Sequence, residues 1–160
     1  MDIYILRHGI AEPHAQDGRD ETRALTEDGR TKLRAVLERA RAAKAAPSLI
    51  LTSPYVRAVQ TAEIAAKELG YKKRIVKSDA LAPDSSPEAV WAEIRSHAKE
   101  KALLVAGHEP LLSATVSFLV GSGRTVVELK KGALARISIE APAKTPQGVL
   151  AWLITPKLAQ

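Results

Sequence analysis

Two arginines and two histidines stand where three apolar segments end. Arg7 and His8 directly follow an apolar run at the start of the chain. His108 follows a second such run, and Arg57 comes shortly after a third. A guanidinium can hold a phosphoryl group through two parallel charge-assisted hydrogen bonds, and a neutral imidazole can act as a nucleophile. Together these residue types indicate chemistry on a phosphate group.

The three apolar segments have the pattern of strands that are buried on both faces. Residues 3–6, 49–51 and 102–107 are apolar without the alternation of a half-exposed strand. Such strands belong to parallel α/β sheets, whose ligands bind beyond the carboxyl ends of the strands. Gly9 permits a sharp turn and a close approach of backbone to a ligand just after the first strand. We therefore expect the two arginines and two histidines to gather at one edge of the sheet.

Helices are predicted between these strands. Leu33, Val36, Leu37 and Ala40 recur with the spacing of one apolar helix face. Thr26 stands where an N-cap hydroxyl would begin that helix.

Three further helices are predicted from the residues at their ends. Ser53-Pro54 and Ser86-Pro87 each combine an N-cap hydroxyl with a proline at the first helical position. The helix after the first pair should end before Gly70, which fits the residue that follows a helix terminus. A last helix over residues 111–120 should be closed by Gly121 in the same way.

The last third of the chain changes in character. Residues 133–139 and 149–154 are predicted to form two antiparallel strands, joined by a turn over 142–148. Residues 74–76 suit a weak strand at a sheet edge, and residues 126–129 suit an extended segment. The order of the elements predicts an α/β fold with three α/β/α layers and a mostly parallel central sheet.

Four short motifs resemble the histidine phosphatase superfamily, the phosphoglycerate mutase-like enzymes. They are Leu6-Arg7-His8-Gly9, Thr52-Ser53-Pro54, Arg57-Ala58 with Gln60-Thr61, and Gly107-His108. Together with the short chain and Ile10-Ala11, they are similar to the small SixA-type phosphohistidine phosphatases. The resemblance covers nearly the whole chain. It implies the phosphoglycerate mutase-like fold, with one strand antiparallel to the others.

We expect His8 to be the catalytic nucleophile. The unperturbed pKa of histidine is about 6.5, and the positive charges of Arg7 and Arg57 should disfavour the imidazolium form. A backbone carbonyl near Gly9 is the expected partner of the other ring nitrogen, because such a bond fixes the tautomer. After His8 attacks phosphorus in line, Arg7, Arg57 and His108 should stabilise the equatorial oxygens, and water should then hydrolyse the phosphohistidine.

The substrate phosphate is expected to contact Arg7, Arg57, His108 and the backbone N–H of Glu109. Because the arginines neutralise its charge, we expect neither a metal nor another cofactor.

One departure from the family pattern bears on the substrate. Many phosphomonoesterases of the superfamily carry a glutamate general acid after the third strand, but here that loop is Ala80-Leu81-Ala82-Pro83-Asp84-Ser85. Asp84 is a possible substitute. An alkoxide leaving group needs a proton, whereas an imidazole leaving a phosphoramidate needs less help. The expected substrate is therefore phosphohistidine on a phosphorylated protein.

Other residues near the motifs have two interpretations. Ser53 suits a helix cap better than a ligand. Thr61 could orient Arg57 one turn away, or be a hydroxyl on a helix face. Glu12 could shape the mouth of the site or be exposed. Lys130 and Lys131 could line its rim, although a solvated turn is the preferred interpretation.

Composition limits the class of protein. The chain has 160 residues, of which 46% are hydrophobic and 26% charged, which suits one domain over residues 1–160 with a real core. The net charge of +6 favours anionic partners, but with only 4% aromatic residues we expect no nucleic-acid binding. Cysteine is absent, which excludes a cysteine nucleophile and a disulfide.

No leader and no apolar run of membrane-spanning length is evident, so we expect a cytoplasmic protein without membrane association, as a monomer or weak dimer.

Two alternatives stay open at this stage. The first is a small-molecule phosphomonoesterase of the same superfamily. The second is a non-catalytic module that binds phosphate or nucleic acid through its basic surface.

Overall fold

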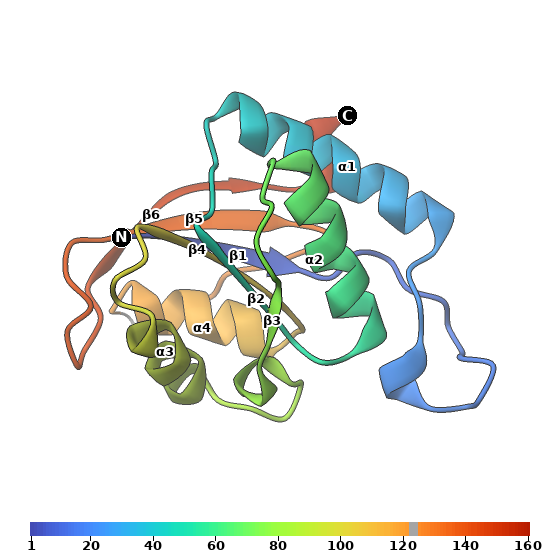
Figure 1. Cartoon of the computed structure of the whole chain (residues 1–160), viewed down its shortest axis with the longest axis horizontal. Helices are drawn as coiled ribbons and strands as arrows, with labels where there is room; N and C mark the ends of the chain where they lie inside the picture. Colours follow the sequence, from blue (N-terminus) through green and yellow to red (C-terminus); the bar gives the residue numbers. More distant parts are fainter. Residues whose placement is uncertain (122–124) are drawn as a thin grey trace.

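A computed structural model describes residues 1–121 and 125–160. Its centre is a six-stranded sheet with helices on both faces (Figure 1). The strands are β1 (Asp2–Arg7), β2 (Leu49–Thr52), β3 (Val76–Lys77), β4 (Ala102–Gly107), β5 (Leu134–Ile139) and β6 (Gly148–Ile154). The helices are α1 (Glu27–Ala42), α2 (Val56–Glu68), α3 (Pro87–Ser96), α4 (Leu111–Leu119) and α5 (Pro156–Ala159), with short 3-10 turns η1 (Asp20–Thr22) and η2 (Asp79–Leu81).

The sheet has the order β3-β2-β4-β1-β5-β6. β1 pairs in parallel with β4, which pairs in parallel with β2, and β2 does the same with β3. β5 is antiparallel to both of its neighbours, so among the described strands it alone runs against the others. The three-layer α/β prediction is confirmed, including the single antiparallel strand and the C-terminal strand pair.

The central strand β1 divides the core between the two faces of the sheet. Ile3 and Ile5 pack in the cluster that contains α3 and α4, whereas Tyr4 and Leu6 pack in the cluster that contains α1 and α2. This alternation is the period of two of a strand, and both faces are apolar because both are covered. Burying each aliphatic side chain contributes about 1.5–3 kcal/mol relative to exposure, so β1 is firmly anchored.

Two of the three predicted N-caps are confirmed. The Thr26 hydroxyl accepts a hydrogen bond from the Gly29 N–H at 2.9 Å at the start of α1. The Ser86 hydroxyl accepts one from the Ala89 N–H at 3.2 Å, and Pro87 is the first residue of α3.

Ser53 is not a helix cap, and that prediction was wrong. Helix α2 begins at Val56, with Tyr55 at the N-cap position and no side-chain cap bond. Ser53 and Pro54 form the turn that precedes it. The Ser53 hydroxyl is instead engaged by a side chain from another strand, a tertiary contact that overrides the local capping preference.

The predicted ends of the helices are confirmed, whereas the predicted bounds of the edge strand differ from those in the structure. Gly70 and Gly121 have φ values of 70° and 73° just after α2 and α4, as expected of residues that end a helix. β3 lies at the sheet edge as expected, but it covers 76–77 rather than 74–76. Residues 126–129 lie outside the strands of the sheet. None of the helices in the described ranges has the length and apolar character needed to span a membrane.

Candidate active site

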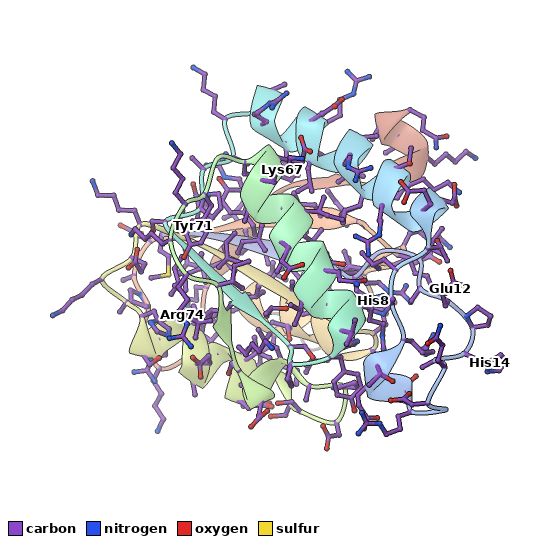
Figure 2. All side chains as sticks on the ribbon, turned by 45° about the vertical axis from the view of Figure 1, so that its right-hand side comes forward. His8, Glu12, His14, Lys67, Tyr71 and Arg74 are labelled. Atoms are coloured by element: carbon purple, nitrogen blue, oxygen red, sulfur yellow. The ribbon has the colours of Figure 1, made fainter. Side chains whose placement is uncertain are left out.

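The four predicted site residues come together at the carboxyl edge of the sheet. His8 and His108 follow the paired strands β1 and β4, and their ring centroids are 5.2 Å apart. Tyr55 links them to Arg57: its ring is 5.0 Å from the His108 ring and 5.0 Å from the Arg57 guanidinium carbon. Figure 2 shows His8 beside the N-terminal end of α2.

These side chains are buried. The exposed fractions of His8, Arg57 and His108 are 7%, 4% and 2%, respectively, and Arg7 is half-buried. Polar side chains this deeply buried are uncommon unless a partner compensates their lost hydration.

The ring of His8 is fixed by its own backbone turn. Its Nδ1 lies 2.7 Å from the Gly9 carbonyl oxygen, so the neutral ring carries its proton on Nδ1 and donates it there. The predicted carbonyl partner is thereby confirmed, and Nε2 is left with its lone pair. The Gly9 N–H donates to the Thr61 hydroxyl at 3.2 Å, and the Gly132 N–H donates to the His8 carbonyl at 3.0 Å.

Thr61 therefore supports the turn at Gly9 and does not orient the Arg57 side chain. Its hydroxyl donates to the Arg57 backbone carbonyl at 2.7 Å, one turn earlier in α2, and accepts from Gly9.

Both histidines are held in the neutral form. Burial lowers the pKa of His8 to about 4, opposed by the bond to Gly9 and assisted by the positive charges of Arg57 and Arg7. Burial also lowers the pKa of His108 to about 3, assisted by repulsion from the His8 ring when that ring is protonated and by the positive charge of Arg57. The expectation that arginines disfavour imidazolium is confirmed in direction, although burial is the larger cause.

Ser53 determines which nitrogen of His108 carries the proton. The Ser53 hydroxyl lies 2.8 Å from His108 Nε2 and accepts from the Tyr55 N–H at 3.3 Å. A neutral ring could donate or accept at Nε2. The Ser53 hydroxyl already accepts from Tyr55, and among the described residues its own hydrogen has no acceptor other than Nε2, so we infer that it donates there and that the ring proton is on Nδ1. His108 Nδ1 is buried and has no hydrogen-bond partner among the described residues.

Arg57 is held by the loop that follows β1. Its two terminal nitrogens donate to the Asp20 backbone carbonyl at 2.7 Å and to the Asp20 carboxylate at 3.0 Å. Burial raises the pKa of the Asp20 carboxyl, but hydrogen bonds from Arg23 and Arg57 outweigh this, so the pKa lies below its ordinary value. A guanidinium has five N–H donors, so the Nε edge of Arg57 stays available.

Arg7 is anchored from the opposite side of the site. One terminal nitrogen donates to the Leu129 carbonyl at 2.6 Å, and burial lowers the pKa of the guanidinium against the opposing charge of Glu109. Its Nε has no partner within the described ranges.

Three buried side-chain nitrogens of the candidate site thus lack a partner among the described residues: Arg7 Nε, Arg57 Nε and His108 Nδ1. Within residues 1–121 and 125–160, they are three of the four buried side-chain N or O atoms without a partner. Buried donors are nearly always satisfied in folded proteins, and an unsatisfied one costs about 1–3 kcal/mol. The acceptor oxygens of an anion are the kind of partner that such donors require.

The other predicted residues lie around this group. The Glu109 carboxylate accepts from the Ser113 N–H at 3.0 Å, at the start of α4. Glu12 is exposed on the outer loop (Figure 2), and Asp84 is exposed on the turn before α3. Lys130 is exposed and pairs with Glu128. Lys131 is also exposed, and its charge contributes to the low pKa of His8.

Asp20 and Tyr55 are the site residues that sequence reasoning missed. Asp20 lies in a charge-rich loop without periodicity, where no local signal separates it from its neighbours. Tyr55 stands two residues before Arg57 in the motif region, and its position there was the available signal. In the described part of the chain, no group of three or more His, Asp or Glu side chains is placed to hold a metal ion.

Comparison with known proteins identifies the family of the chain. The family model of the histidine phosphatase superfamily (branch 1) matches residues 3–82. An uncharacterized protein of Picosynechococcus sp. is 40% identical over 113 residues, which is 69% of this chain and 67% of that protein. The phosphohistidine phosphatase SixA of Escherichia coli is 25% identical over 162 residues, covering 98% of this chain and 94% of SixA.

The structures agree more closely than the sequences. The structure of the protein histidine phosphatase SixA complexed with tungstate superposes with a TM-score of 0.90 at 25% identity, covering all of both chains. A mycobacterial glucosyl-3-phosphoglycerate phosphatase shares the fold with a TM-score of 0.66 at 17% identity, covering 93% of this chain and 96% of that one.

The fold and the comparisons define the class as phosphatases, which are hydrolases. The chain belongs to the histidine phosphatase superfamily, and its structure is SixA-like.

Proposed function

We propose that this protein hydrolyses phosphohistidine on a protein substrate, through a covalent phosphohistidine on His8. The observation that carries the proposal is the group of three buried donors without partners, on Arg7, Arg57 and His108, beside a neutral imidazole. A phosphoryl group offers the acceptor oxygens and the negative charge that these donors require.

The reaction follows from this geometry in two steps. His8 Nε2 uses its lone pair to attack phosphorus, and the P–N bond to the substrate imidazole breaks, with its electron pair leaving on that ring. Water then attacks phosphorus, the bond to His8 Nε2 breaks, and inorganic phosphate leaves with the free imidazole restored. Arg7 Nε, Arg57 Nε and His108 Nδ1 stabilise the charge on the equatorial oxygens in both transition states.

The loop after β3 supports the choice of a P–N bond over a P–O bond. It carries no glutamate, and Asp84 in that loop is exposed. An imidazole leaving group takes up its proton readily, so a buried general acid is less necessary than for an alkoxide. SixA, to which the chain is similar, is named a phosphohistidine phosphatase.

The remaining expectations belong to the same proposal. Residues 1–160 form one histidine phosphatase domain, which the sheet supports because β1 and β6 lie in it together. The partner is a phosphorylated protein, the location is the cytoplasm, and the protein is a monomer or weak dimer.

Trapping the covalent intermediate tests the proposal. Brief incubation with a labelled phosphohistidine peptide should leave acid-labile, base-stable label on the wild-type protein. His8→Asn keeps a donor toward the Gly9 carbonyl but removes Nε2, so it should retain neither label nor turnover. Full turnover by His8→Asn would overturn the mechanism. A large preference for sugar phosphates over the phosphohistidine peptide would favour the small-molecule phosphomonoesterase instead.

A further inference from the structure

A basic cavity opens beside the candidate active site. Its volume is about 670 Å³, far more than one phosphoryl group occupies, and it lies between the loop after β1, the turn before β5 and the helix α5. The side chains that matter for its chemistry are those of Arg7, Ile10, Lys32, Lys130, Lys131 and Lys157.

The cavity adjoins the proposed nucleophile. Arg7 and Ile10 line it, and His8 and Gly9 are the two residues between them in the sequence. The turn that carries Lys131 is tied to the nucleophile, because the next residue, Gly132, donates its N–H to the His8 carbonyl at 3.0 Å. Among the described lining residues, Arg7 also belongs to the candidate site, so a molecule in this cavity would contact one of the side chains proposed to hold the phosphoryl group.

The lining is strongly cationic. Five of its side chains are basic, and Glu128 is the one acidic side chain among the described lining residues. Lys130 pairs with Glu128, and Lys32 pairs with Asp28 at 2.7 Å. Lys131 and Lys157 are exposed and form no ion pair with any residue in the described ranges. Uncompensated charges of one sign attract and orient a partner of the opposite sign.

The form of the cavity favours a protein segment over a small molecule. Lys130, Lys131 and Lys157 are exposed lining residues, and a lysine ammonium is a point charge on a flexible stem. Such lysines suit the scattered carboxylates of a protein surface, whereas small-ligand pockets depend on a few precisely placed buried polar groups.

We propose that this basic cavity docks an acidic segment of the phosphorylated protein substrate, next to the phosphohistidine that is hydrolysed. The proposal rests on the proposed function, and it adds a selectivity: phosphohistidine in an acidic surrounding is preferred over the same group in a neutral one. Carboxylates of the segment pair with Lys131 and Lys157 while the phosphoryl group lies against Arg7.

Two phosphohistidine peptides provide the test, one flanked by glutamates and one by serines. We expect the wild-type protein to show a kcat/KM several-fold higher for the acidic peptide, mainly through KM. The combined variant Lys131→Glu and Lys157→Glu should lower this preference about 5- to 20-fold, since an exposed ion pair changes affinity about 2- to 5-fold. Added salt should lower the preference of the wild type as well.

A control variant reverses a single charge elsewhere on the surface. Lys72 is exposed and follows Tyr71, which lies far from His8 in Figure 2, so Lys72→Glu should leave the preference at the wild-type value. Equal hydrolysis of both peptides by the wild type, or an unchanged preference in the combined variant, would overturn the docking proposal. So would a loss in that variant confined to small carboxylated phosphomonoesters, which would indicate a small-molecule subsite.

A binding measurement separates this proposal from the proposed function. If neither phosphopeptide is hydrolysed, fluorescence anisotropy with the unphosphorylated acidic peptide still decides the question. Binding that is lost in the combined variant and kept in Lys72→Glu supports docking; absence of binding by the wild type contradicts it.

Discussion

At the scale of the residue, Ser53 is the least expected participant. Its hydroxyl lies between the Tyr55 N–H and His108 Nε2, and it is fully buried. By donating to Nε2 it holds the proton of the neutral His108 ring on Nδ1, the nitrogen left without a partner. Ser53 is therefore a positioning residue that acts through His108.

Replacing Ser53 by alanine should free the proton of His108 to occupy either nitrogen. We expect kcat to fall about 10-fold, because one hydrogen bond in the transition state contributes about 1–1.5 kcal/mol, while KM changes little. Nitrogen NMR of His108 should show the Nδ1–H tautomer in the wild type and a mixture in Ser53→Ala. A single unchanged tautomer in the variant would contradict this role.

Asp20 is a second positioning residue, and it acts through Arg57. Its carboxylate and carbonyl hold the two terminal nitrogens of Arg57, which leaves Nε without a partner among the described residues. Asp20→Ala should lower kcat/KM about 10- to 100-fold, the cost of a charged hydrogen bond. Asp20→Asn keeps an acceptor and should lose less.

Glu21→Ala serves as the control for Asp20→Ala. Glu21 is exposed on the same turn, and within the described ranges its one ion pair is with the exposed Arg19. If Asp20→Ala were as active as Glu21→Ala, the loop would have no part in positioning Arg57.

At the scale of the element, α1 contacts the segment that follows His8. Its N-cap residue Thr26 donates its N–H to the Ile10 carbonyl at 2.9 Å. Gly29, in the first turn of α1, packs so closely that an added Cβ would lie 2.8 Å from the Ile10 backbone nitrogen. The start of α1 thus packs directly against the turn at Gly9 and Ile10.

Gly29→Ala should therefore destabilise the protein, although glycine to alanine in a helix ordinarily stabilises. We expect the free energy of unfolding to fall by about 1–3 kcal/mol, since backbone must move to admit the methyl group. Activity should fall as well, because the displaced Ile10 adjoins Gly9. Urea unfolding and turnover measure both effects, with Thr31→Ala on the exposed face of α1 as the control.

The elements differ in how well the sequence predicts them. Thr26, Ser86 and Gly70 satisfy backbone groups of their own helices, so their short-range signals were sufficient. Ser53-Pro54 has the same pattern as Ser86-Pro87, yet its hydroxyl bonds to a histidine 55 positions away. That choice depends on tertiary structure, which local pattern does not contain.

The contacts of the candidate site also differ in how well the sequence predicts them. The gathering of Arg7, His8, Arg57 and His108 was predictable, because the ends of parallel strands share one edge. The bond from His8 to Gly9 was also predictable, since it joins neighbours in the chain. The contact of Asp20 with Arg57 was not, because an irregular loop gives no spacing from which to place a side chain.

At the scale of the whole molecule, the two buried histidines couple stability to pH. The pKa values of His8 and His108 in the folded protein are about 4 and about 3, below the value of about 6.5 for an unfolded chain. Between pH 6.5 and 4 the unfolded chain therefore binds protons that the folded protein does not. Stability is full above pH 6.5 and is lost as the pH falls through this range.

Each histidine should contribute a slope of about 1.4 kcal/mol per pH unit within that range. Urea unfolding at about pH 7 and pH 5.5 measures the loss before most carboxylates titrate. The combined variant His8→Asn and His108→Gln should lose less stability than the wild type over the same interval. Equal losses in the two proteins would show that neither histidine is held neutral.

The order of strands in the sheet also has a consequence for the folding of the nascent chain. β1 precedes the other described strands in the sequence, yet its hydrogen-bonding neighbours are β4 and β5, which end at Gly107 and Ile139. While the ribosome is still making the middle of the chain, the segment bearing His8 has nothing to pair with on either side. A nascent chain therefore carries His8 without the strands that flank β1 until β4 and β5 have been synthesised, and the candidate site can assemble only after that.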